Sequence, residues 1–135
     1  MAQVKTSAGE YVDLMMSAGE YIPGGWSYAA ASGGIVNSTT AVTISPALAG
    51  FRNTIKAIQL SGDALGVATE VAIRDGAAGA VLWRMKIGTV GLVGGSSYIF
   101  ASPLKGTAGN LLEFLTLTAS ITGGIYFNAQ GGQVP

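Results

Sequence analysis

Cysteine and histidine are absent from the 135-residue chain, so any chemistry would depend on carboxylates, lysines, tyrosines or hydroxyl groups. Without imidazole or thiolate the chain has no disulfide, no His/Cys zinc site and no histidine-based acid–base or triad mechanism. We therefore expect no catalytic residue, no cofactor-binding residue and no metal ligand. The composition predicts a protein that is not an enzyme and needs no cofactor.

Two short motifs have spacings that are known from catalytic or nucleotide-binding sites. Ser102 to Lys105 fits the Ser-x-x-Lys pattern of acyl-enzyme chemistry, which needs the serine at a helix start and further motifs that are missing here. The glycines from Gly88 to Gly95 lack both the Lys-Ser/Thr of a P-loop and a βαβ pattern. We interpret the first motif as a strand end with a solvated lysine, and the second as bends or close backbone packing.

The carboxylate groupings worth testing are Glu10 with Asp13 and Asp63 with Asp75. A glycosidase needs two carboxyl groups facing each other across a cleft, and a calcium loop needs denser Asp/Asn spacing with a closing glutamate. The sequence does not show which carboxyl groups face each other, and the spacing of a calcium loop is missing. These carboxylates are expected to be solvated residues of turns or of the N-terminal segment.

Aromatic residues could form a sugar-binding platform, but they do not recur on one face together with polar partners. Packing in the core and at protein interfaces, where aromatic residues are enriched, is the simpler interpretation. The aromatic residues considered are Tyr21, Trp26, Tyr28, Trp83, Tyr98, Tyr126 and Phe127.

Residues 1–42 differ in character from the rest and are predicted to form an extended N-terminal arm followed by a first strand. Ser7–Tyr11 (Ser-Ala-Gly-Glu-Tyr) recurs as Ser17–Tyr21. The repeat could make two similar contacts along an arm, or it could be a pair of turns, since Ala-Gly before a polar residue is common in turns. Ser7–Met16 is the best helix candidate in the chain, although Gly9 weakens it. The candidate contact residues toward a larger partner or another subunit are Tyr11, Tyr21, Trp26 and Tyr28.

Residues 43–135 read as a series of short strands that form one domain. Asp75-Gly76, between two strand-like runs, is a strong hairpin signal. Evenly spaced strands with Gly, Asp and Pro turns predict an all-β fold, an antiparallel β-sandwich that is jelly-roll-like. The expected strands are 51–60, 67–74, 80–87, 97–101 bounded by Pro103, 111–118 and 121–128.

Some of these strands carry apolar residues at positions that alternation would place on both faces. Examples are Ile55 with Ile58, and Leu82 with Val81, where Leu82 is expected to face outward beside Arg84 and Lys86. Strands that are buried on both sides are unusual in a small two-sheet monomer. Only 10% of the residues are charged, against about 25% in an average domain. We therefore expect a homo-oligomer in which neighbours cover the outer face of a sheet.

The net charge and the pattern of apolar and hydroxyl residues argue against two other kinds of partner. The formal net charge is zero and the basic residues form no run, so nucleic acid is not expected as a partner. In the most apolar stretch, Leu111–Phe127, a hydroxyl residue stands at every second position from Thr116 to Thr122. That period belongs to a strand and not to a membrane-spanning helix, so no membrane partner is expected.

Four stretches from Thr43 onward carry a resemblance to a known class of protein: Thr43–Arg52, Ala72–Gly76, Phe100–Gly106 and Ile125–Gly131. On these stretches the chain resembles small virion structural proteins of tailed bacteriophages, the capsid decoration or cement proteins. The resemblance implies a β-sandwich on the capsid surface of the virion, commonly a homotrimer, that binds the major capsid protein and stabilises contacts between capsomers. Some proteins of this kind belong to tails or fibres, so a tail or fibre adhesin that binds a host glycan is the alternative.

Overall fold

A computed structural model describes residues 3–5, 11–13, 16–17, 20–21, 24–35, 39–118 and 122–135. Within these ranges every regular element is a β-strand, and the sheets contain only antiparallel pairs. The expectation of an all-β fold built from antiparallel strands is confirmed.

Two sheets of four strands form the body of the protein. The first sheet has the order β10 (Leu92–Lys105), β7 (Arg52–Gly62), β12 (Ile125–Val134), β5 (Trp26–Tyr28). The second sheet has the order β6 (Val42–Ser45), β11 (Leu112–Thr116), β8 (Thr69–Asp75), β9 (Ala80–Ile87). Two further strand pairs precede them: β1 (Gln3–Lys5) with β2 (Tyr11–Asp13), and β3 (Met16–Ser17) with β4 (Glu20–Tyr21).

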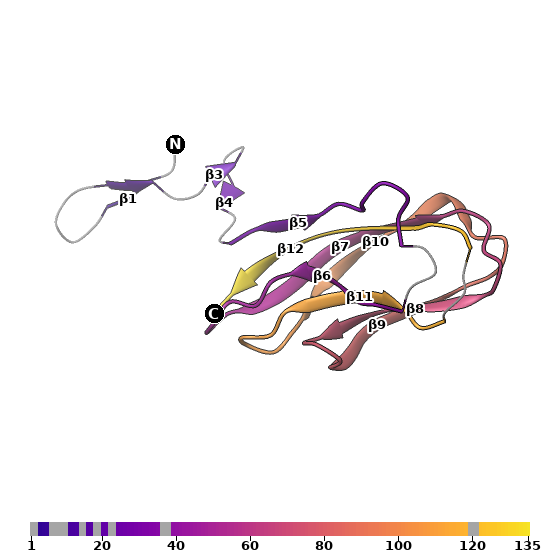
Figure 1. Cartoon of the computed structure of the whole chain (residues 1–135). Coiled ribbons are helices and arrows are strands. Elements are labelled where there is room, and N and C mark those ends of the chain that lie inside the picture. The colour runs from indigo at the N-terminus through magenta and orange to yellow at the C-terminus, as the bar shows by residue number, and fades with distance from the viewer. Residues whose placement is uncertain are drawn as a thin grey trace.

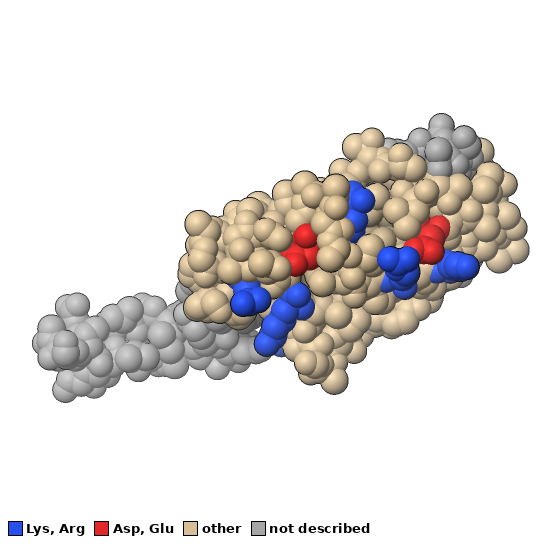
Figure 2. All heavy atoms as spheres, turned by 90° about the horizontal axis from the view of Figure 1, so that it is seen from below, with Lys and Arg blue, Asp and Glu red and all other residues tan. Residues whose placement is uncertain are grey.

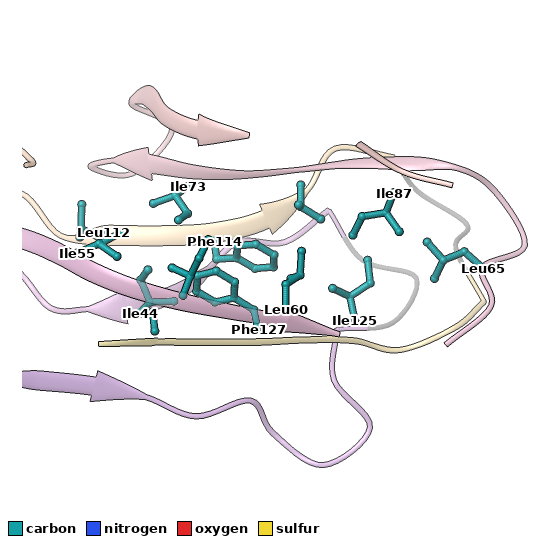
Figure 3. Close-up of a cluster of buried hydrophobic side chains, with 13 residues drawn as sticks. Ile44, Ile55, Leu60, Leu65, Ile73, Ile87, Leu112, Phe114, Ile125 and Phe127 are labelled. Atoms are coloured by element: carbon teal, nitrogen blue, oxygen red, sulfur yellow. The ribbon is translucent and has the colours of Figure 1, made fainter. Parts of the chain in front are cut away.

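The two four-stranded sheets lie one over the other, and the hydrophobic core fills the space between them (Figure 1). Figure 3 shows side chains from both sheets meeting in this layer. Phe114 of β11 and Phe127 of β12 stack with ring centroids 4.0 Å apart, and both are fully buried. Because they come from opposite sheets, this stacked pair holds the two layers together at the centre.

Contacts between strands of different sheets close the two long sides of the sandwich. On one side Trp83 of β9 and Tyr98 of β10 have ring centroids 5.9 Å apart, and the Tyr98 hydroxyl donates to Met85 Sδ at 3.5 Å. On the other side β5 of the first sheet contacts β6 of the second, and Ile35, which follows β5, pairs with Ile125 of β12 through two backbone hydrogen bonds. Apolar side chains at these edges extend the core outward.

The order of the strands follows one regular rule from β5 to β12. β8 and β9 are neighbours, and so are β7 and β10, β6 and β11, and β5 and β12. The eight strands thus form four nested pairs, with the β8–β9 hairpin at the centre and β5 and β12 outermost. The chain crosses between the sheets at every connection of this series except the one between β8 and β9.

A β-bulge in β7 decides which side chains reach the core. Gln130 of β12 pairs with Ala57 of β7, and the next residue, Gly131, pairs with Ile55. Lys56 is therefore the extra residue in β7. A bulge changes the parity of the alternation, and both Ile55 and Ile58 therefore point inward with no exposed surface. The expectation that these two residues make β7 apolar on both faces is wrong, because they share one face.

A second bulge has the same effect in β9. Here β8 advances by one residue while β9 advances by two, from Trp83 to Val81, which makes Leu82 the extra residue. Leu82 is half-buried and packs against the core, whereas Arg84 and Lys86 are exposed. The expectation that Leu82 faces outward beside these two basic residues is also wrong.

The sequence predicted that Pro103 bounds its strand, but the strand continues through this proline. β10 continues to Lys105, with a shift of register between Ile99 and Leu104. Proline lacks a backbone N–H, but β10 is an edge strand that pairs only with β7, and an edge or a bulge tolerates proline. The expected strand 97–101 is therefore the middle of a much longer one.

The Asp75-Gly76 hairpin is confirmed. β8 and β9 pair in antiparallel fashion around a turn at residues 76–79, and the return strand Ala80–Ile87 has the expected bounds. Gly76 has a φ of 86°, a left-handed conformation that glycine adopts without steric cost. The expected strand 121–128 is less accurate, because β12 runs from Ile125 to Val134.

The N-terminal strands pair only with one another among the described elements. Tyr11–Asp13 is strand β2, so the helix candidate over residues 7–16 is wrong at these positions. One copy of the repeat falls between β1 and the start of β2, and the other runs from the last residue of β3 to the end of β4. Residues 6–10, 14–15, 18–19 and 22–23 lie outside the described residues, and most of the expected arm falls there or beside them.

Candidate interaction surface

The outer face of the first sheet is a broad surface of small and amide side chains. In one row Ile99, Ala57, Gln130 and Ser27 lie side by side across all four strands. Side chains alternate along a strand, so most of the residues that flank this row in the four strands point into the core instead. Ile99 is 82% exposed, the highest value among the large hydrophobic residues that the structure describes. We call this surface the first-sheet face.

Amide side chains dominate the middle of the first-sheet face. Gln59 of β7 and Gln130 of β12 pair through their amide groups at 3.2 Å. Asn128 Oδ1 accepts a hydrogen bond of 3.0 Å from the backbone N–H of Ala30. A surface hollow of about 240 Å³ lies beside them and is lined by residues 59–61, 94–97 and 128. The face therefore presents neutral hydrogen-bonding groups.

No carboxylate stands on the first-sheet face, because none of the strands β5, β7, β10 and β12 contains Asp or Glu. Its charges are three basic residues: Arg52 at the start of β7, Lys56 at the bulge, and Lys105 opposite Thr54. All three are exposed. The Arg52 guanidinium donates to the Gly106 carbonyl at 3.4 Å.

The second sheet differs because its charges occur in pairs of opposite sign. Arg74 forms an ion pair with Glu113, and Arg84 lies 3.1 Å from Glu70. Figure 2, which views the molecule from below relative to Figure 1, shows basic and acidic groups side by side in an otherwise uncharged surface. Pairing of this kind leaves little net charge on the second sheet.

Glu113 is almost fully buried although it lies on the outward side of the central strand β11. One carboxylate oxygen accepts from Arg74 Nε at 2.6 Å and from the backbone N–H of Ala78 at 2.9 Å. Ala78 belongs to the turn between β8 and β9, so the hairpin of the chain itself covers this carboxylate. Hydrogen bonds of this kind compensate a buried charge.

Asp75 is engaged in the same way at the end of β8. It accepts from the Thr107 backbone N–H at 2.9 Å, from the Thr107 hydroxyl at 2.6 Å and from Asn110 Nδ2 at 3.2 Å. Burial raises the pKa of Asp75, but these hydrogen bonds and the charge of Arg52 outweigh it, so the pKa lies below its ordinary value. These contacts tie the β10–β11 loop to the β8–β9 hairpin.

Of the two carboxylate groupings suggested by the sequence, Asp63 and Asp75 do not come together as an acid–base pair, and Glu10 of the other grouping lies outside the described residues. Asp63 follows β7, whereas Asp75 ends β8 in the network just described. Among the described residues no group of three or more acidic side chains could hold a metal ion. Ser102 and Lys105 both lie in strand β10, not on a helix. The described part of the chain contains no helix that is long and apolar enough to cross a membrane.

Of the four candidate contact residues, two lie in the edge strand β5. Trp26 Nε1 donates to the Gly132 carbonyl at 3.2 Å, and the Tyr28 ring lies 6.4 Å from the Phe127 ring. Both side chains are half-buried and pack against the core. Tyr11 and Tyr21 lie in β2 and β4, and their side chains fall outside the described part of the structure.

Ile99, Lys56 and the amides of the first-sheet face were not singled out from the sequence. The sequence contains one signal for them, because four separate stretches lack acidic residues. This signal becomes informative only when those stretches are known to form one sheet.

The fold and the surface thus define an all-β protein with two four-stranded antiparallel sheets and one outer face whose strands contain no carboxylate. No known protein family, no curated protein and no solved structure matches the chain.

Proposed function

We propose that this protein is a virion structural protein that decorates the capsid surface of a tailed bacteriophage. In this role it binds the major capsid protein, forms a homo-oligomer, in the simplest case a trimer, and stabilises contacts between capsomers. The observation that supports it best is the first-sheet face, a broad surface without carboxylates that exposes Ile99. Interfaces are depleted in acidic residues relative to the rest of a protein surface.

We further propose that the sandwich is a jelly roll. A jelly roll has eight strands in two sheets and contains two Greek keys. The four nested strand pairs from β5 to β12, wrapped over two sheets, support this description. The architecture is frequent in viral capsid proteins and in lectin domains, so it agrees with the proposed role but does not select it over sugar binding.

Co-sedimentation with capsids tests the proposal. Capsids assembled from the major capsid protein of the same genome are mixed with purified protein and pelleted. We expect saturable binding at a fixed ratio to the major capsid protein, and capsids that resist heating better when decorated. A replacement of Ile99 by Asp should weaken binding, whereas Lys86→Gln, on the second sheet, serves as the matched surface control. Absence of the wild-type protein from the pellet at all concentrations would refute the role.

The surface hollow beside Gln59 supports a second candidate function, a tail or fibre adhesin that binds a host glycan. Neutral amide and hydroxyl groups are suited to hydrogen bonding with sugars, and Tyr126 lies in the neighbouring row opposite Ser61. A glycan array tests this function directly. The adhesin predicts hits that disappear when Gln59 and Asn128 are both replaced by Ala. A blank array together with binding to capsids would exclude it.

A further inference from the structure

Charge is distributed unequally along the chain. Residues 1–21 contain one lysine, Lys5, against three acidic residues: Glu10, Asp13 and Glu20. Because the whole chain has seven basic and seven acidic residues, the remainder has six basic residues against four acidic ones. The N-terminal segment is therefore acidic, and the sandwich carries an excess of positive charge of the same size.

The excess positive charge gathers on the first-sheet face. On the second sheet Glu113 and Glu70 each have an arginine partner, and Asp75 is held by Thr107 and Asn110. The strands of the first sheet contain no acidic residue, so Lys56 and Lys105 have no carboxylate partner on this face, whereas the charge of Arg52 already acts on Asp75. An acidic partner is the natural complement of such a face.

The register places the basic residues and the exposed isoleucine next to one another. Ile99 lies opposite Ala57, the bulge residue Lys56 follows, and Lys105 lies opposite Thr54 on the neighbouring strand. Arg52 continues the same line at the start of β7. We call these four residues, Ile99, Lys56, Lys105 and Arg52, the basic strip. It combines one large apolar side chain with three cations.

The repeat in the N-terminal segment presents the complementary sequence twice. Each copy ends in Gly-Glu-Tyr, at residues 9–11 and 19–21, so a carboxylate is followed directly by an aromatic ring. A carboxylate can pair with Lys56 or Lys105 while the ring covers Ile99, which would remove apolar surface from water. The second copy of the repeat supplies a second carboxylate for the other lysine, and two linked contacts provide avidity.

The N-terminal segment also joins the sandwich at the end of the sheet that carries Arg52. The Gln133 N–H donates to the Gly24 carbonyl at 3.1 Å, and Val134 is the register partner of Arg52. However, β5 and β10 are opposite edges of the first sheet, and the described strands β1–β4 pair only with one another. The C-terminal end of the segment therefore lies near one end of the face, and its described strands do not pair with the first sheet of the same copy.

We propose that residues 1–21 of one copy bind the basic strip of a second copy. This inference rests on the homo-oligomeric role proposed above and names the surfaces that form the oligomer. The contact is heterologous, since a segment of one copy meets a different surface of the next. Heterologous contacts form closed rings when the rotation between copies closes, which is compatible with a trimer.

Charge reversal with sedimentation analysis of the full-length protein tests the inference, and no capsid is needed. We expect the double variant Lys56→Glu, Lys105→Glu to raise the dissociation constant of self-association at least tenfold, about 1.4 kcal/mol. Lys86→Gln, an exposed lysine on the second sheet, is the control and should leave the constant unchanged. Association of the wild type should weaken in about 1 M salt, where the Debye length is about 3 Å.

A complementary swap makes the test specific. The triple variant Glu10→Lys, Asp13→Lys, Glu20→Lys should also fail to self-associate, but it should form mixed oligomers with the Lys56→Glu, Lys105→Glu protein. Self-association of the double variant as tight as that of the Lys86→Gln control would overturn the inference, and so would the absence of mixed oligomers. A wild-type protein that stays monomeric would overturn it as well. Binding to capsids is measured separately, so the decoration role can survive the loss of this interface.

Discussion

Replacing Ile55 or Ile58 by Ala tests whether the bulge at Lys56 places both side chains in the core of a single copy. Both have no exposed surface. Replacing either by Ala removes three carbon atoms, which accounts for about 2.4 kcal/mol at about 0.8 kcal/mol per buried CH₂. The cavity left behind adds to this value, so we predict that each variant loses about 2–5 kcal/mol of unfolding free energy.

Urea unfolding followed by the fluorescence of Trp26 and Trp83 measures this loss. The experiment is run at two protein concentrations, because association makes apparent stability depend on concentration. Ile99→Ala is the matched control, since Ile99 is 82% exposed. It should change the unfolding free energy of the isolated chain by less than about 0.5 kcal/mol.

The two core variants should lose a similar amount of unfolding free energy at both protein concentrations. If Ile55 instead faced outward into an interface between copies, Ile55→Ala would behave like the Ile99→Ala control in dilute protein. Its effect would then appear only where the protein associates. A loss below about 0.5 kcal/mol for Ile55→Ala in the monomer would refute the assignment of both residues to one face.

Three further predictions concern single sites. Gly131→Ala should destabilise by several kcal/mol in thermal unfolding, since its Cβ would clash with the Thr54 carbonyl, whereas Gly88→Ala meets no neighbouring atom and should be close to neutral. Glu113→Ala leaves the Ala78 N–H and Arg74 without their acceptor and should cost about 3–5 kcal/mol in urea unfolding, with Glu113→Gln less severe; equal, small losses would contradict the network. The lowered pKa of Asp75 contributes stability above its ordinary value of 3.8 that disappears as the pH falls through the lower folded-state pKa, so Asp75→Asn should flatten the acid limb of the pH–stability curve.

The candidate contact residues show where sequence reasoning about the surface stopped. Trp26 and Tyr28 were selected because aromatic residues favour interfaces, and the structure places them against the core from an edge strand. The first-sheet face is assembled from Ile99, Lys56 and Gln130, which are far apart in the sequence. Their proximity depends on strand order and register, and no local pattern encodes those.

Some features of the fold were determined by the sequence alone. The absence of His and Cys is read directly from the sequence. The Asp75-Gly76 turn and the return strand 80–87 are local properties, because turn residues and alternation act over a few neighbouring positions. The tertiary structure decided the rest: the bulges at Lys56 and Leu82, the passage of β10 through Pro103 and the nested strand order. A bulge exists only relative to the strand opposite it, so the residues of one strand cannot reveal which of them is the extra one.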